Sequence, residues 1–248
     1  MTHSHHILVL GATGATGHAF IHEALSSTNP NPPKLTLYVR TPSKLPKSII
    51  ESTNPRVRVV QGELTDDGVL DLAMSSGVDT VVSFLGAYFS FGPIFSRRKD
   101  TPIASSFPHI FQAMKKASIT RILVLSTPSY RPPLHEEEKN PTTTNLTLPK
   151  RLYLLLPPLI APQGNAEMVA IANAVVAATG AAGASFEYTV FRIPHLTNGS
   201  AELEVLEGGG EDGWKGGLGL SRGSLARWVL GEVEGRRWVG GCPLLGNC

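Results

Sequence analysis

The apolar run Ile7-Leu8-Val9-Leu10 leads directly into Gly11-Ala12-Thr13-Gly14-Ala15-Thr16-Gly17, and residues 18–25 then read as the first turns of a helix. A strand, a glycine-rich turn and a helix N-terminus in this order are typical of a dinucleotide-binding unit. The first glycine permits a tight turn, the second lets the backbone approach a pyrophosphate, and the third lets helix and strand pack closely. The spacing is GxxGxxG rather than the usual GxGxxG, so the alternative is a flexible turn without a ligand.

The composition favours a small-molecule partner. The chain has 248 residues, with 22 lysines and arginines against 20 aspartates and glutamates, so its formal net charge is only +2. This balance gives no overall field that would favour nucleic acid or a membrane surface. Strand-like sequence begins by Ile7 and no apolar run approaches the ~20 residues of a membrane span, so we expect a soluble, cytoplasmic protein. Cys242 and Cys248 lack metal-ligand spacing, and we predict no metal site.

Apolar segments of strand length recur along the chain with helical segments between them. Such alternation is typical of parallel βαβ units. Several segments, such as Ile122-Leu123-Val124-Leu125, are apolar at every position, as expected of strands covered by helices on both faces. We predict strands at 6–10, 35–40, 56–61, 79–85, 121–126 and 186–192, and helices over 102–117 and 164–178. The expected fold is α/β, a doubly wound parallel sheet of the Rossmann type, with residues 1–248 as one domain and a small C-terminal substrate-binding portion.

Two segments interrupt this alternation. Residues 128–163 are rich in proline and threonine, and residues 194–220 contain two runs of glycine. Long excursions from small domains are commonly lids or binding loops, so we expect both segments to border a substrate pocket. The apolar part of the first, residues 152–160, could instead meet a partner subunit or a membrane surface, although the proline pair at 157–158 should interrupt any helix there. After the second segment, Ser221 is expected to start the last helix.

The end of the second predicted strand indicates the cofactor. An acidic residue at this position binds the ribose 2′-hydroxyl of NAD, whereas an arginine accommodates the 2′-phosphate of NADP. The chain has Arg40 here, followed by Lys44, and it has no aspartate or glutamate from residue 35 to residue 50. Because a guanidinium matches a phosphate in both charge and geometry, the sequence favours NADP(H). A solvated surface arginine is the alternative.

The order of several motifs resembles one known family. They are the glycine turn at 11–17, Tyr38-Val39-Arg40-Thr41-Pro42-Ser43-Lys44-Leu45, Leu123-Val124-Leu125-Ser126-Thr127 and residues 186–196 (FEYTVFRIPHL). The chain is similar to the atypical short-chain dehydrogenases/reductases, and in particular to their NAD(P)H-binding, NmrA-like and biliverdin reductase B (flavin reductase)-like branch. The resemblance covers nearly the whole chain, including residues 220–226, where Ser224 replaces the acid of the family's SRxDLA segment.

The resemblance implies a set of cofactor-binding residues. The pyrophosphate would be held by the glycine turn, and Arg40 would hold the 2′-phosphate. Glu63 stands where the family usually has aspartate, which is a mild departure. The implied residues are Gly11, Thr13, Gly14, Ala15, Thr16 and Gly17 at the pyrophosphate, Arg40 at the phosphate, Glu63 and Leu64 beside the adenine, and Leu85 and Gly86 under the ribose. Lys44 joins Arg40 as a predicted cofactor-binding residue because it follows Arg40 in the sequence.

The usual catalytic pair of short-chain dehydrogenases is missing. Those enzymes use a tyrosine with a lysine four residues later, and none of the five tyrosines here has that lysine. Tyr188 and Arg192 come nearest, but they lie on a predicted strand, where four residues span roughly 13 Å. Ser126 and Thr127 remain at the end of the fifth strand, with Tyr130 just beyond. Their hydroxyls could polarise a substrate carbonyl, or could simply bond to nearby backbone.

His195 is the fourth candidate catalytic residue. It follows the sixth predicted strand and matches the histidine after the proline in the flavin reductase-like pattern. Histidine ordinarily titrates near neutral pH, which suits a proton donor. An ordinary loop histidine is the alternative.

Three functions fit these observations. The first is an NADPH-dependent reductase of a hydrophobic carbonyl, quinone, enone or flavin-like molecule held under residues 128–163. The second is an NmrA-like regulator that binds NADP(H) and a protein partner without transferring hydride, which the missing Tyr-x-x-x-Lys would suit. The third is an isomerase or cyclase on the same fold. The oligomeric state, monomer or homodimer, is left open by the sequence.

Overall fold

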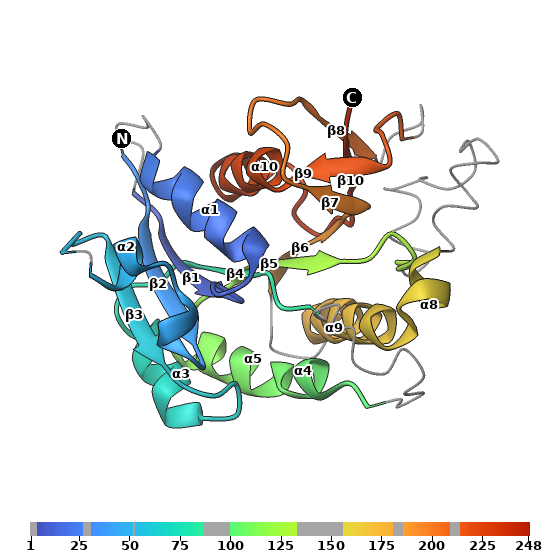
Figure 1. The fold of residues 1–248 in the computed structure, drawn as a ribbon. Helices are drawn as coiled ribbons and strands as arrows, with labels where there is room; N and C mark the ends of the chain where they lie inside the picture. The colour runs from blue at the N-terminus through green and yellow to red at the C-terminus, as the bar shows by residue number, and fades with distance from the viewer. Residues whose placement is uncertain are drawn as a thin grey trace.

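An eight-stranded sheet forms the centre of the protein in the described part of the chain (Figure 1). The computed structural model describes residues 4–26, 31–51, 53–86, 100–132, 156–180, 186–208 and 214–248. The strands of this sheet lie in the order β3-β2-β1-β4-β5-β6-β10-β8. They are β1 (His6–Leu10), β2 (Lys34–Val39), β3 (Val57–Gln61), β4 (Thr80–Ser83), β5 (Arg121–Ser126), β6 (Glu187–Arg192), β8 (Val205–Gly208) and β10 (Leu244–Asn247).

The order of the first six strands confirms the predicted doubly wound fold. β1 pairs in parallel with both β2 and β4, so the strand order reverses beside β1. β3 extends the sheet on one side, and β5 and β6 extend it on the other, all by parallel pairing. Ligands of such sheets bind beyond the carboxyl ends of the strands at this reversal point. The six predicted strands are therefore confirmed within one or two residues at each end.

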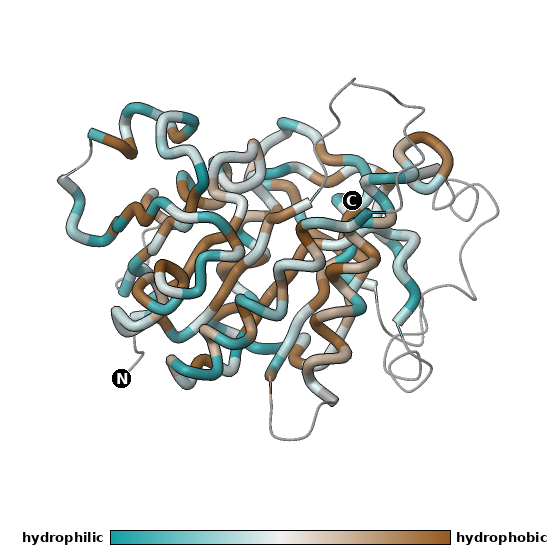
Figure 2. Tube along the Cα trace, turned by 90° about the horizontal axis from the view of Figure 1, so that it is seen from below, coloured by the Kyte–Doolittle hydropathy of each residue, from teal (hydrophilic) through white to brown (hydrophobic). Residues whose placement is uncertain are grey.

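Helices cover both faces of the sheet (Figure 1). On one face lie α1 (Ala15–Ser26) and α10 (Arg222–Gly235), and on the other α3 (Asp67–Met74), α5 (Phe107–Lys116) and α9 (Pro162–Gly180). The strand residues alternate between the two layers. Ile7 and Val9 of β1 pack with α1 and α10, whereas Leu8 and Leu10 pack with the other three helices. The apolar strands accordingly run through the interior in Figure 2.

The predicted helix over 102–117 is divided at Ser106. The structure has α4 (Pro102–Ser105) followed by α5, and Pro108 lies in the first turn of α5. In one continuous helix, the Pro108 ring would clash with the carbonyl of residue 104. The predicted helix at 164–178 is confirmed as α9, and Ser221 is confirmed as the N-cap of α10, since its Oγ accepts from Gly223 N at 3.2 Å.

Residues 194–220 form more regular structure than the sequence indicates. They contain β7 (His195–Thr197), β8 and β9 (Gly219–Ser221), with β7 and β9 paired in parallel as a separate two-stranded sheet. β10 then pairs in parallel with β6 and antiparallel with β8. These strands are three or four residues long and include glycines, so they lack the apolar period by which longer strands are recognised.

The proline pair does not prevent a helix. The short helix α8 (Leu156–Ile160) contains both prolines in its first turn, where a missing N–H breaks no intrahelical hydrogen bond. Its Leu159 is 75% exposed and its Ile160 is 61% exposed, and the helix appears as an apolar segment beside the grey traces in Figure 2. The rest of the first excursion, residues 133–155, lies outside the described residues.

A buried ion pair joins β5, β6 and α10. The Arg121 Nη2 donates to Glu232 Oε1 at 2.8 Å, and the two side chains are 2% and 0% exposed. Glu232 also accepts from the backbone N–H groups of Arg237 and Trp238, both at 3.0 Å. Thr189 of β6 completes the network, because Arg121 Nη2 donates to its Oγ1 at 2.7 Å. Burial lowers the pKa of Arg121 to about 10, so the guanidinium stays charged at neutral pH beside the carboxylate.

A second buried network ties down the last strand. The Asn247 side chain accepts from Ser221 N at 2.6 Å and donates to Ser224 Oγ at 3.0 Å and to Glu204 O at 2.9 Å. Ser224 thus occupies the place of the family's acid as a neutral, hydrogen-bonded residue. One side chain of β10 thereby holds the start of α10 and the connection before β8.

Candidate cofactor and active site

The turn after β1 has room only for glycine at two positions. Gly11 has φ of +76°, and a Cβ there would lie 2.8 Å from the carbonyl carbon of Phe84. A Cβ on Gly17 would lie 2.4 Å from Gly11 O. Real Cβ atoms do not come this close to backbone, so these two glycines are needed to pack α1 against the end of β1 and to bring the turn beside the end of β4. These are two of the three roles predicted for the glycines.

The backbone of the turn suits a pyrophosphate. Gly14 N donates to Gly11 O at 3.1 Å, and α1 then begins at Ala15. The first N–H groups of a helix have no acceptor within the helix, and here they face the carboxyl edge of the sheet. Thr13, Gly14 and Thr16 are half-buried and Ala15 is exposed, so a phosphate could reach this turn. The residues present therefore fit a dinucleotide.

The basic residues after β2 present free side chains. Arg40 directly follows Val39, the last residue of β2, and its side chain is exposed. Only its backbone is engaged, since Arg40 O accepts from Gln61 Nε2 at 3.3 Å. Lys44 ends the 3-10 helix η1 (Pro42–Lys44) and is also exposed. Within the described residues, neither cation has a protein counter-ion, and both remain available to an anionic ligand.

The loop after β3 is fixed to the neighbouring strand. The Tyr38 hydroxyl of β2 donates to Glu63 O at 2.7 Å, and burial raises the pKa of Tyr38 to about 12. Gly62 makes this contact possible, because a Cβ there would lie 2.3 Å from the Tyr38 hydroxyl oxygen. The Glu63 side chain is exposed, and Leu64 is half-buried against the core. The two residues predicted to flank an adenine thus stand on a rigid support.

Leu85 and Gly86 connect the cofactor side of the edge to the end of β5. Leu85 N donates to Ser83 Oγ at 3.3 Å, and Leu85 and Gly86 are half-buried. A Cβ added to Gly86 would lie 3.7 Å from Leu125 Cδ2 of β5 and 3.7 Å from Met168 Cγ of α9. The loop after β4, the end of β5 and the first turns of α9 therefore converge at one place.

The predicted catalytic hydroxyls lie at this place and are buried. Ser126 is 0% exposed, and its Oγ donates to Met168 O at 3.1 Å. Thr127 is 3% exposed, and its Oγ1 donates to Asn165 Oδ1 at 2.9 Å. Tyr130 is also buried, and its backbone N–H donates to Thr127 O at 3.1 Å. The structure thus brings the three predicted residues together on one turn after β5.

The sequence analysis missed two polar residues here. Asn165 lies on the first turn of α9, and Ser129 Oγ donates to its Oδ1 at 2.6 Å. An isolated asparagine in an alanine-rich helix carries no motif, so only its contact with the turn after β5 reveals it. Arg192, considered above only as half of an unsuitable pair, is buried at the end of β6. Its Nε donates to Cys242 O at 2.8 Å and its Nη1 to Tyr130 O at 3.3 Å, so it fastens the Tyr130 turn to the sheet.

His195 follows the end of β6, which lies beside this turn in the fold, but its side chain faces solvent. Ile193 N donates to Ser126 O at 3.1 Å, which places the end of β6 beside the predicted catalytic serine. Two residues later, His195 begins β7, where its backbone N–H donates to Leu218 O and its side chain is exposed. The structure gives no contact between His195 and the hydroxyls of the turn.

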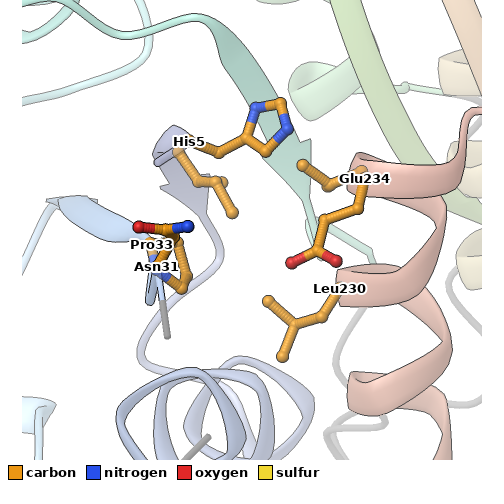
Figure 3. A pocket seen from close by; sticks show the side chains of 7 residues that line it. His5, Asn31, Pro33, Leu230 and Glu234 are labelled. Carbon is orange, nitrogen blue, oxygen red and sulfur yellow. The ribbon is translucent and has the colours of Figure 1, made fainter. Parts of the chain in front are cut away.

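A shallow hollow lies at the opposite edge of the sheet (Figure 3). His5 and Pro33, which precede β1 and β2, form one wall with Asn31, and Leu230 and Glu234 of α10 form the other. Because the glycine turn follows the other end of β1, this hollow is not the cofactor site. The described residues also include no group of three or more histidines, cysteines, aspartates or glutamates that could hold a metal ion.

The comparisons with known proteins identify the family. Residues 11–234 match the family model described as NAD(P)H-binding. The chain belongs to this NAD(P)H-binding family. The match begins at Gly11 and covers the glycine turn, the β5 turn and most of α10. The predicted resemblance and the predicted nicotinamide cofactor are thereby confirmed. No curated protein matches the chain.

Solved structures that resemble this NAD(P)H-binding protein share its Rossmann fold. A short-chain dehydrogenase/reductase from Veillonella parvula, in complex with NADP, is 19% identical with a TM-score of 0.62, over 98% of this chain and 94% of that one. The anaerobillin reductase ChuY from Escherichia coli O157:H7 is 13% identical with a TM-score of 0.67, over 98% and 97%. The oxidoreductase ylbE from Lactococcus lactis is 15% identical with a TM-score of 0.61, over 98% and 91%. At these identities the likeness shows the fold alone.

None of the described helices combines the length and the apolar character needed to cross a membrane.

Proposed function

We propose that this protein is an NADPH-dependent oxidoreductase that reduces a hydrophobic small molecule carrying a carbonyl, quinone, enone or flavin-like group. One observation carries the proposal: the glycine turn and the buried polar turn after β5 are joined through Phe84, Leu85 and Gly86 into one continuous edge. When bound, the nicotinamide supplies a hydride. The chain's own residues supply the binding site, the orientation and the polar groups around the reacting oxygen.

The preference for the 2′-phosphorylated cofactor rests on Arg40. Its guanidinium is exposed at the end of β2, and the neighbouring Lys44 adds a second cation. No acidic residue from 35 to 50 could instead accept a ribose hydroxyl. The Veillonella parvula relative crystallised with NADP supports this preference. The cytoplasm is the proposed site of action.

The residues after β5 and β6 have distinct proposed roles. Ser126 fixes α9 to the end of β5 through its bond to Met168 O. Thr127 and Tyr130 form the polar wall of the substrate site, and Arg192 holds that wall to β6. The imidazole of His195, exposed at the start of β7, is the proposed proton donor. The group that accepts the hydride would thereby lie next to the polar side chains of this wall.

The experiment that tests this function is NADPH oxidation by the purified protein, followed at 340 nm across a panel of quinones, enones, aldehydes and flavins. Quenching of NADPH fluorescence, recorded in parallel, establishes binding independently of turnover. Turnover of any class supports the reductase. Tight NADPH binding without turnover of any compound would contradict it and would favour an NmrA-like regulator, which the absence of a Tyr-x-x-x-Lys pair also suits.

A further inference from the structure

Three hydroxyl groups at the β5 turn, those of Ser126, Thr127 and Ser129, already donate their protons to acceptors within the protein. Each hydroxyl has one proton to donate. Ser126 Oγ gives its proton to Met168 O at 3.1 Å. Thr127 Oγ1 and Ser129 Oγ both donate to Asn165 Oδ1, at 2.9 and 2.6 Å. None of the three hydroxyls therefore has a proton left for a substrate oxygen.

Beside these three hydroxyls, the amide nitrogen of Asn165 is a further hydrogen-bond donor. A side-chain amide carries two N–H groups, and within the described residues Asn165 Nδ2 donates to no acceptor. The residue is half-buried, and Nδ2 is not among the fully enclosed polar atoms. Two hydroxyl donors on Oδ1 fix the orientation of the amide and turn Nδ2 away from Thr127 and Ser129. The NH2 group of Asn165 is thus held in one orientation, is accessible, and can donate to a ligand.

Asn165 lies where the loop after β4, with Leu85 and Gly86, approaches the end of β5. Asn165 lies one helical turn before Met168, which contacts both Ser126 and the position of Gly86. The same turn of α9 therefore contacts the loop predicted to pass under the ribose and the turn that follows β5.

We propose that Asn165 Nδ2 donates a hydrogen bond to the oxygen of the substrate's reducible C=O group, and that Thr127 and Ser129 are positioning residues for this amide. The inference rests on the proposed function and narrows its substrate class to carbonyls, quinones and enones, whose reduction places charge on an oxygen. A fixed donor aimed at that oxygen stabilises the charge as it forms.

The electron and proton balance needs no acid at Asn165. The hydride adds to the carbon that is reduced, and the π electrons move onto the oxygen. This oxygen then takes one proton, supplied by water or through His195. The amide donates a hydrogen bond throughout and is chemically unchanged, which is consistent with the absence of a Tyr-x-x-x-Lys pair.

The experiment compares Asn165→Asp with Asn173→Asp, using menadione as the quinone probe with NADPH. Aspartate at 165 still accepts from Thr127 and Ser129 but replaces the NH2 group with an oxygen. Asn173 lies on the same helix with an exposed side chain, so it is a matched control. We expect kcat to fall about 100-fold in Asn165→Asp, with NADPH affinity and melting temperature close to the control. Equal kcat in the two variants would overturn the inference and leave the reductase standing.

The hydroxyl variants separate positioning from direct donation. Thr127→Val and Ser129→Ala should each lower kcat by about tenfold, because they loosen the amide without removing its N–H groups, and Thr127→Ser should restore the rate. In the Asn165→Asp background, Thr127→Val should add little. If Thr127→Val cost more than Asn165→Asp, the hydroxyl would be the donor and the inference would be wrong.

A binding measurement keeps the two proposals distinct. Menadione is titrated calorimetrically into each protein with NADP+ present. If the wild type binds menadione without turnover and Asn165→Asp binds it about tenfold more weakly, the reductase fails and the Asn165 contact stands. If the wild type neither turns over nor binds menadione, both proposals are overturned.

Discussion

The two halves of the sheet are held together by different means. Around β1, the packing depends on close contacts between backbone atoms. A Cβ at Gly11 or Gly17 would overlap main-chain atoms. Around β5 and β6, the packing depends on buried polar side chains from distant parts of the sequence, such as Arg121 with Glu232, or Thr127 with Asn165. The cofactor half is therefore specified locally, and the substrate half is specified by contacts that form only in the folded protein.

We expect the largest effect on stability from Glu232→Ala, which tests whether buried polar contacts hold the half of the sheet around β5 and β6. The substitution leaves Arg121 charged and buried without its carboxylate, and removing one partner of a buried ion pair costs about 4 kcal/mol. Urea unfolding should show this loss in the free energy of unfolding. Arg227→Ala removes the ion pairs of an exposed arginine on the same helix with Glu23 and Glu202, and it should cost much less. An equally small effect of both variants would mean that the buried network does not hold this half.

Gly17→Ala tests the half of the sheet around β1, where packing depends on backbone contacts. The new Cβ would overlap Gly11 O, so the helix must shift, at a cost of about 2–3 kcal/mol and with loss of most NADPH affinity. Gly231→Ala is the control, because nothing lies within 4 Å of its Cβ position in α10, and it should stabilise the helix by about 0.5–1 kcal/mol. Unfolding curves and NADPH fluorescence titrations measure both effects. Unchanged NADPH affinity in Gly17→Ala would contradict the assignment of the turn.

Arg40→Ala tests whether the half of the sheet around β1 selects NADPH over NADH through the Arg40 side chain. Loss of the guanidinium should weaken NADPH binding about tenfold, which corresponds to about 1.4 kcal/mol, and should leave NADH binding nearly unchanged. Lys47→Ala, an exposed cation of the next helix α2 (Lys47–Ile50), is the control. Equal loss of both cofactors would indicate a general disturbance instead of a phosphate contact.

Tyr38→Phe should have the smallest effect. It removes one hydrogen bond, from the Tyr38 hydroxyl to Glu63 O, worth about 1 kcal/mol at neutral pH. The pKa of Tyr38 is raised to about 12 in the folded protein, above the ordinary value of 10.0. The unfolded chain therefore loses this proton first, and stability should fall as pH rises from 10 toward 12. The free energy of unfolding, measured across this pH range, should fall less steeply in Tyr38→Phe than in the wild type.

The same contrast explains what could be read from the sequence. The glycines at 11 and 17 and the six apolar strand segments have local causes, so they predicted the cofactor turn and the doubly wound sheet. The short strands β7 to β10 carry no such apolar signal. They are held by contacts between residues far apart in the sequence, such as those of Asn247 with Ser221 and Glu204. Asn165 was missed for the same reason: only the fold brings it to Thr127. The proposed roles of Ser126, Thr127, Tyr130 and His195 stay predictions.

The place of β10 also bears on how the chain is assembled. Protein synthesis delivers β1 to β6 and their helices before residues 244–247 exist, so the cofactor half can form early. Until residues 240–244 arrive, the outer edge of β6, with buried residues such as Val190 and Phe191, has unpaired backbone groups that favour pairing with other chains. The segment that leads into β10, together with the first residue of β10, thus covers an aggregation-prone edge late in synthesis.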